Sequence, residues 1–447
     1  MNVLPRLLYL FQAIPIKLPA SFLASFKLIC RRFLWAGRPA RLNWDRMTMP
    51  KMRGGLGVPD LSKYHKACLL TRIVDWHVHK EEKDWVKLEE AFVGFRISHL
   101  PWIDKKFTPR SCTSHPVIGP TLACLRKTSG DSHMASHPGP MTPLNLNPGF
   151  SEGINTINPG GSETAPTLRA HQFFDKGKLL SHSAMVRRFP DFQIPRFKYF
   201  HIRNFFLNSQ TSDLWCRDLS HLEKLCESSA PQRHLISGIY LWLTPQETAM
   251  STIHTKWEAD LQVSLSDGDW SSIWNHIHKG SINVSAQENR YKIYSRWYRT
   301  PSKLHKFYPT VSPTCWRCGG EVGTLLHIWW SCSKLQPFWQ EVHSHIAKIT
   351  SYTPDFTPGQ YLLHHTSLPQ SIYRKSLVLH LINAATQCIP IRWKDPIPPT
   401  LLDWQVRVDK IEMMDRLIHQ ANDNSEKFRH IWRCWTLYRT PTTHNST

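Results

Sequence analysis

The pattern of cysteine and histidine between positions 315 and 332 restricts the fold more than any other feature of the sequence. Cys315, Cys318, His327 and Cys332 follow the spacing C-x2-C-x8-H-x4-C. Three thiolates and one imidazole are the ligand set of a closed, tetrahedral structural zinc site, which leaves no open position for catalysis. His327 and Cys332 are about one helical turn plus a residue apart, so both reach one ion only if that turn is distorted. The alternative is four unrelated residues in a chain with 11 Cys and 25 His.

Cations and aromatic rings surround this pattern. Upstream lie Arg290, Tyr291, Lys292, Tyr294, Arg296, Trp297, Tyr298, Arg299, Lys303, His305, Lys306, Phe307 and Tyr308, and within the pattern lie Trp316, Arg317, Trp329 and Trp330. Cations meet the phosphates of a nucleic acid, and flat rings stack on its bases. The alternative is a half-buried helix with solvated Lys and Arg. Next to a zinc knuckle, the mixture favours nucleic-acid binding.

The charge balance points to a polyanionic partner. Lys and Arg number 55 against 34 Asp and Glu, which gives a net charge of +21. Such an excess suits a nucleic acid or an anionic membrane surface. The 11 Cys form an odd set without a regular framework. Together with a zinc site, this predicts a reducing, intracellular location in the cytoplasm, the nucleus or both.

The amino-terminal stretch could be taken for a signal peptide, because the apolar run from Leu7 to Phe11 follows the basic residue Arg6. Pro5 and Pro15 interrupt the run, and it is too short to span a bilayer. We therefore expect neither secretion nor a membrane-spanning segment.

Residues 1–111 predict helices and one tight turn. Phe22, Phe26, Ile29 and Phe33 recur at helical spacing. The glycines at 54, 55 and 57 resemble a phosphate loop, but no Lys-Ser/Thr follows them, so a turn into a helix is the better interpretation. Asp60 then caps a helix that runs to about His79.

At this point the sequence resembles a known family. Leu4-Pro-Arg-Leu-Leu-Tyr-Leu-Phe-Gln-Ala-Ile-Pro-Ile, Phe33-Leu-Trp-Ala-Gly, Gly54-Gly-Leu-Gly-Val-Pro-Asp-Leu and Tyr64-His-Lys-Ala resemble the thumb, and the region after it, of reverse transcriptases from LINE-type (non-LTR) retrotransposons. Leu326-His-Ile-Trp-Trp-Ser-Cys resembles the carboxy-terminal zinc knuckle of the same open reading frame. Arg392-Trp-Lys-Asp-Pro, Pro398-Pro and Asp403-Trp are similar to its tail.

The resemblance implies a carboxy-terminal, RNA-binding piece rather than a complete polymerase. The family's palm holds two metal ions with an adjacent Asp-Asp pair, and this sequence contains no Asp-Asp. The family's endonuclease is also not found. We therefore expect no enzymatic activity of the chain on its own, and we predict no catalytic residues. An enzyme would need a palm from another chain.

The predicted fold class is mainly α. The expected order is a helical thumb-like region (1–111), a flexible linker (112–166), a helical middle region (167–310), the zinc knuckle (311–345) and a carboxy-terminal helical bundle (346–447). The linker prediction rests on turn-rich segments such as Asn158-Pro-Gly-Gly-Ser. In the bundle, helices are expected from Pro337, from about Ser371 to Cys388, and from about Pro399 to Gln420.

Two hypotheses follow for function. The first is a nucleic-acid-binding module whose partner is RNA, with DNA and other retrotransposon proteins as further partners. Its predicted metal ligands are Cys315, Cys318, His327 and Cys332, and its predicted RNA contacts are Arg31, Arg32, Arg41, Arg53, Arg290, Lys292, Arg296, Arg299 and Arg317. The second is a helical scaffold that zinc merely organises, or a decayed transposon fragment. The two differ in whether the basic residues gather on one face with the knuckle.

Overall fold

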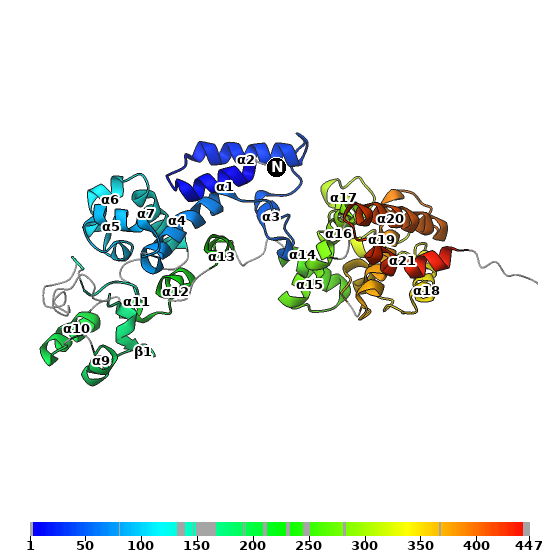
Figure 1. Cartoon of the computed structure of the whole chain (residues 1–447). Coiled ribbons are helices and arrows are strands. Elements are labelled where there is room, and N and C mark those ends of the chain that lie inside the picture. Colours follow the sequence, from blue (N-terminus) through cyan, green and yellow to red (C-terminus); the bar gives the residue numbers. More distant parts are fainter. Residues whose placement is uncertain are drawn as a thin grey trace, which may run out of the picture. The chain divides into compact units, whose positions relative to one another are not determined.

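The chain is mainly helical, as predicted, and divides into two compact units (Figure 1). A computed structural model describes residues 3–79, 81–131, 139–145, 147–148, 167–190, 192, 194–208, 212–228, 233–244, 251–279, 283–365 and 368–440. Unit 1 comprises Met1–Ala40 and Pro59–Gln246, and unit 2 comprises Arg41–Val58 and Glu247–Thr447.

In its described residues, unit 1 contains short and medium helices and one small hairpin. Its α-helices are α1 (Val3–Ala13), α2 (Ala20–Leu34), α4 (Leu61–Val78), α5 (Asp84–Val93), α6 (Arg110–Ser114), α7 (Ile118–Asp131), α9 (His182–Arg188), α10 (Arg196–Asn208), α11 (Ser212–Cys216), α12 (His221–Glu227) and α13 (Leu235–Trp242). The 3-10 turns are η2 (Ile97–His99), η3 (Lys105–Phe107) and η4 (Ala170–Phe173), and β1 (Phe174–Asp175) pairs antiparallel with β2 (Lys178–Leu179).

Helix α4 is the centre of unit 1. Asp60 caps it as predicted, because its carboxylate accepts from the backbone N–H groups of Ser62 at 3.0 Å and Lys63 at 3.2 Å. The helix contacts α1, α7, α12 and α13. Its buried residues therefore lie on several sides, whereas a surface helix would bury a single stripe.

The predicted linker 112–166 is wrong in its first part. Ile118, Leu122 and Leu125 are spaced as on one face of a helix, and all three are fully buried in α7, which packs on α4. Pro120 falls in the first turn of α7, where a missing N–H costs nothing. Further along, residues 141–145 are buried too. The turn-rich stretches 132–138 and 149–166 lie outside the described residues.

Unit 2 is built from helices around the knuckle. It contains α3 (Trp44–Thr48), η1 (Lys51–Arg53), α14 (Ser251–Leu261), α15 (Asp267–Lys279), α16 (Val284–Tyr294), α17 (Pro301–Phe307), the π-helical turns η5 (His327–Ser331) and η6 (Gly359–Leu363), α18 (Gln336–Thr350), α19 (Ile372–Ile391), α20 (Leu401–Ala421) and α21 (Ser425–Arg439). Residues 41–58 were predicted to belong with the thumb-like region, but η1 contacts α15 and Met49 joins the core of unit 2.

The expected boundaries at 166 and 345 do not divide the structure. Residues 167–244 belong to unit 1, so the predicted middle region 167–310 is split between the units. The knuckle and the bundle share one core, because Trp329, Trp339 and Trp404 are completely buried in the same cluster.

The three predicted bundle helices are present as α18, α19 and α20. Helix α19 passes Pro390 and ends one residue later, so the proline removes only one hydrogen bond in its last turn. A fourth helix, α21, was not predicted. It contacts α18, α19 and α20.

The apolar stripe of α15 belongs to the core, as its spacing predicts. Trp270, Ile273, Trp274 and Ile277 are all nearly inaccessible to solvent. Asp269 is the third residue of this helix. Its carboxylate accepts from the backbone N–H of Ser266, whose hydroxyl in turn accepts from the N–H of Asp269.

His254 makes the stability of unit 2 sensitive to acid. Its ring stacks on Trp270 with centroids 3.9 Å apart, and Nε1 of Trp274 donates to its Nε2 at 3.1 Å. Burial lowers the pKa of His254 to about 4, although the negative charges of Glu258 and Asp267 act to raise it. Between pH 6.5 and 4 the unfolded chain therefore binds more protons than the folded one, and stability falls as the pH falls through this range.

We expect His254→Gln to remove part of this acid sensitivity, because an amide oxygen can accept from Trp274 and does not titrate. The loss of unfolding free energy between pH 7 and pH 4.5 should shrink by about 2 kcal/mol, after allowing for solvent screening of a half-buried group. Urea unfolding of the full chain at both pH values, with hydrogen exchange of α14 and α15 as the readout, measures the loss of unfolding free energy. His430→Gln, at an exposed position of α21, is the control. If the unfolding free energy of His254→Gln and of wild type changed with pH in the same way, the prediction would be contradicted.

None of the helices in the described ranges is long and apolar enough to cross a membrane.

Candidate metal centre

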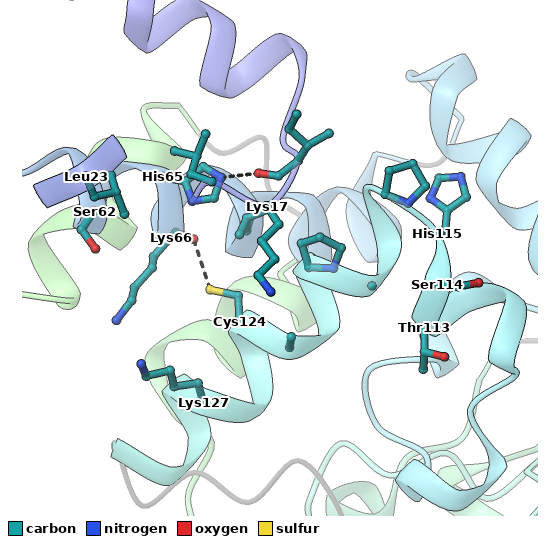
Figure 2. A pocket seen from close by; sticks show the side chains of 17 residues that line it. Lys17, Leu23, Ser62, His65, Lys66, Thr113, Ser114, His115, Cys124 and Lys127 are labelled. Carbon is teal, nitrogen blue, oxygen red and sulfur yellow. Dashed lines mark hydrogen bonds between the residues drawn. The ribbon is translucent and has the colours of Figure 1, made fainter. Parts of the chain in front are cut away.

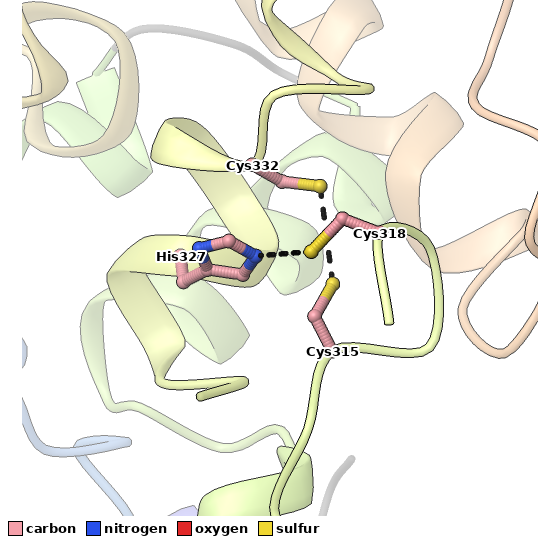
Figure 3. Close-up of side chains that lie close together, drawn as sticks. All are labelled: Cys315, Cys318, His327 and Cys332. Carbon is pink, nitrogen blue, oxygen red and sulfur yellow. Dashed lines mark hydrogen bonds between the residues drawn. The ribbon is translucent and has the colours of Figure 1, made fainter. Parts of the chain in front are cut away.

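The first half of the cluster is a tight hairpin. Thr314 forms a β-bridge with Val322, and the N–H of Cys315 donates to the carbonyl of Glu321 at 2.8 Å. Gly319 turns the chain between them. Its φ of +70° is a backbone conformation that residues with a side chain rarely adopt. The hairpin brings Cys315 and Cys318 to one end, with their sulfur atoms on the same side (Figure 3).

The second half is the distorted turn that the spacing requires. In an α-helix, residues five apart are rotated by about 140° around the axis. In η5 the N–H of Cys332 donates instead to the carbonyl of His327, five residues earlier, at 3.0 Å. This π-helical hydrogen bond widens the turn and brings the imidazole and the thiol to one side.

The four donor atoms lie close together, and two of their separations match those that a tetrahedral ion imposes. They all lie within 4.8 Å of one another. The sulfurs of Cys315 and Cys332 are 3.8 Å apart, and the Cys318 sulfur is 3.4 Å from Nε2 of His327 (Figure 3). With bonds of about 2.3 Å to sulfur and 2.0 Å to nitrogen, tetrahedral geometry predicts about 3.8 and 3.5 Å. Cys315, Cys318, His327 and Cys332 therefore form a cluster that can hold a metal ion.

The backbone prepares one of the thiols for metal binding. Although burial works in the opposite direction, backbone N–H groups of Glu321 and Gly320 and the ring of His327 lower the pKa of Cys318 to about 6. The thiolate is therefore its main form at neutral pH. Burial raises the pKa of Cys315 to about 11, so this thiol loses its proton only when an ion takes it.

Two charged side chains support the ligands. Nδ1 of His327 lies 3.0 Å from a carboxylate oxygen of Glu321, which orients the ring so that Nε2 faces the sulfurs. Arg317 is 2% exposed, donates to the carbonyl of Ile328 at 2.7 Å and lies in the field of Cys332 and Cys315. Three thiolates around a divalent ion would carry one net negative charge, which this guanidinium would offset.

Gly323 joins the hairpin to α17, since a Cβ there would lie 2.5 Å from Cγ of Pro301. We expect Gly323→Ala to destabilise unit 2 by about 1–3 kcal/mol through overpacking and to weaken metal retention. Gly320→Ala is the matched control, because a Cβ at Gly320 meets no atom within 4 Å. Thermal unfolding and metal content of both variants provide the test. Equal behaviour of the two would show that the Gly323 contact is unimportant.

Several predicted nucleic-acid contacts are wrong, because the groups are buried. Arg290 is 1% exposed and donates to the carbonyls of His276 at 3.0 Å and Leu379 at 3.3 Å. Arg317 is enclosed beside the metal ligands. Trp329 and Trp330, which the sequence suggested as stacking rings, belong to the core. None of these side chains can reach a phosphate or a base in this conformation.

Other predicted cations are accessible but partly engaged. Lys292 pairs with Glu288 at 2.7 Å, and Arg53 is half-buried in η1. Arg31 and Arg32 are exposed on α2 of unit 1, whereas the knuckle belongs to unit 2.

Five cations of unit 2 gather around Trp297 and α17, and we call them the basic cluster: Arg41, Lys256, Arg296, Arg299 and Lys303. The guanidinium of Arg41 lies over the Trp297 ring at 3.8 Å, and Arg296 donates to the carbonyl of Lys256 at 3.3 Å. Burial lowers the pKa of Lys303, and the other four cations lower it further. Asp260 pairs with Arg296 at 2.6 Å.

The basic cluster adjoins the knuckle. Arg299 and Lys303 flank Pro301, which touches Gly323, and the N–H of Ser302 donates to the Gly323 carbonyl at 3.2 Å. Sequence reasoning did not include Lys256 or Lys303 among the contacts. Lys256 carries no local signal, because only the fold brings α14 next to residues 296–303.

The fold and the cluster define a mainly helical chain with a possible Cys3His metal centre. Comparison with models of known protein families gives no match for this sequence.

Proposed function

We propose that the cluster holds zinc as a structural ion. Three sulfurs and one nitrogen within 4.8 Å of one another suit zinc, and a set of four protein ligands leaves no position for a substrate. The ion would tie the hairpin to η5, and thereby hold α17 against the rest of unit 2. Cys315, Cys318, His327 and Cys332 bind it, Glu321 orients the imidazole, and Arg317 balances the charge.

We further propose that unit 2 binds nucleic acid, with single-stranded RNA as the main partner. The observation that supports this most is the basic cluster beside the knuckle, where, within the described ranges, Asp260 is the carboxylate that pairs with one of the five cations. Phe307 and Tyr308, at the end of α17, are 66% and 57% exposed and offer rings on which bases can stack. Cations with nearby exposed rings suit a single strand better than a duplex.

The order of motifs along the sequence supports a retrotransposon origin for this module. The knuckle and the thumb-like segments resemble those of LINE-type reverse transcriptases, in which such a region would hold template RNA while copying proceeds elsewhere. Other proteins of the same element are then expected partners. This role requires no catalytic residue from the chain itself, and DNA remains a second substrate for the same cations.

A second candidate is a zinc-organised scaffold without a nucleic-acid role. The observation that favours it is the burial of Trp329 and Trp330, which makes the knuckle part of the core. In this case the cations of unit 2 would be ordinary solvated charges.

A salt series separates the two candidates. The full chain, loaded with zinc, should bind a 30-nucleotide single-stranded RNA, and the logarithm of its association constant should fall linearly with the logarithm of salt concentration. Five phosphate contacts predict a slope of roughly −3.5. A single-stranded DNA of the same sequence measures the preference for RNA, and a chelated sample measures the dependence on zinc. Zinc uptake without salt-dependent binding would favour the scaffold.

A further inference from the structure

Unit 1 contains a cavity of about 780 Å³ that the nucleic-acid proposal does not use (Figure 2). Its walls come from the segment between α1 and α2, from α4, and from the residues of α6 and α7. The apolar part of the wall is aliphatic, with Ile16, Leu18, Leu23 and Leu69 among its residues. The volume lies in the range of roughly 300–1,000 Å³ that small-molecule sites occupy.

The charge of this cavity has one sign. Lys17, Lys66 and Lys127 line it, and none of its lining residues is acidic. Figure 2 shows the three side chains around Cys124, and the charges of Lys66 and Lys127 both act on that thiol. Among the described residues, no carboxylate pairs with any of the three amines. Three ammonium groups without counter-charges at an apolar wall are complementary to an anion.

The other polar groups of the wall are largely used within the protein. Nε2 of His65 is 2.8 Å from the carbonyl of Ile16, and the Cys124 thiol donates to the carbonyl of Lys66 at 3.9 Å. Thr113 and Ser114 donate to the carbonyl of Arg110. The lysines are therefore the main groups left to recognise the polar end of a ligand.

We propose that this cavity binds a fatty-acid-type ligand, in which an aliphatic chain lies along the apolar wall and the carboxylate lies in the positive field of Lys17, Lys66 and Lys127. An alkyl chain needs no ring partner. Nucleic-acid bases, in contrast, need flat rings, and the wall offers only those of His65 and His115. The proposal does not depend on the function assigned to unit 2.

Calorimetric titration of the full chain with decanoate, below its micelle concentration, tests the proposal. Binding should strengthen about four-fold for each added CH₂ from octanoate to dodecanoate. Butyrate, which has the charge without the chain, and decyltrimethylammonium, which has the chain without the negative charge, should bind at least ten-fold more weakly.

Two variants locate the ligand. Lys17→Gln/Lys66→Gln/Lys127→Gln should weaken decanoate binding at least ten-fold. Ala123→Trp, which adds bulk at an exposed position of the cavity wall, should abolish it while the melting temperature stays unchanged. Lys105→Gln/Lys224→Gln, on exposed sites of unit 1 outside the cavity, should have no effect. Equal binding of decyltrimethylammonium would overturn the proposal. The proposal would also be overturned if the protein did not bind decanoate but bound single-stranded RNA through the three lysines.

Discussion

Cys332→Ser is expected to abolish metal retention and to unfold the knuckle, with a loss of several kcal/mol in the stability of unit 2. Metal binding to small zinc-finger peptides contributes on the order of 10–16 kcal/mol, so an incomplete ligand set forfeits much of that energy. Cys332 is completely buried, and its position depends on the π-helical hydrogen bond to His327. Metal content after dialysis, together with hydrogen exchange over residues 311–350, measures the effect.

The control for this experiment is Cys434→Ser. Cys434 lies in α21, outside the metal cluster, and its thiol is only partly buried. This variant should keep the metal and the wild-type exchange pattern. Treatment of the wild type with a chelator should reproduce Cys332→Ser. If the variant or the chelated protein kept full protection over 311–350, packing alone would hold the knuckle, and the structural role of the ion would be refuted.

Removing four charges of the basic cluster is expected to weaken RNA binding by roughly 10²–10³-fold at 0.1 M salt. The change is Arg41→Gln, Lys256→Gln, Arg299→Gln and Lys303→Gln in one protein. Arg296 stays in place because it pairs with Asp260 and packs on Trp257. Four lost phosphate contacts should also reduce the salt slope by about 3. Fluorescence anisotropy with labelled single-stranded RNA across a salt series gives both quantities.

A matched variant removes the same charge from other helices of unit 2. Lys410, Lys427, Arg429 and Arg433 are exposed on α20 and α21, and their replacement by Gln should change the affinity only a few-fold. Metal content should remain that of wild type in both proteins. An equal loss of affinity in both would indicate binding through net charge alone, without a defined site.

The metal cluster could be predicted from the sequence because its constraint is mostly local. The four ligands lie within 18 residues, and the requirement for a distorted turn follows from the spacing of His327 and Cys332 alone. The capping by Asp60 and the buried stripe of α15 are local in the same sense. Helix α7 had the same periodic signal in Ile118, Leu122 and Leu125, but Pro116, Gly119 and Pro120 obscured it.

The nucleic-acid contacts could be predicted only in part, because sequence does not show which cations are buried. Arg290 and Arg299 stand nine residues apart in one basic stretch, but Arg290 is enclosed by α19 and the end of α15, and Arg299 is exposed. Arg41 lies more than 200 residues before Lys256 and Lys303 in the chain, and the three become neighbours only when unit 2 folds. Burial and long-range proximity depend on how the helices pack.

The sequence by itself determined the helical class and the ligand set, because helical periodicity and metal-ligand spacing are properties of neighbouring residues. The tertiary structure decided the division into two units, the place of residues 41–58 in the second, and the gathering of the basic cluster beside the knuckle. These depend on contacts between segments far apart in the chain. No pattern within a single segment encodes such contacts.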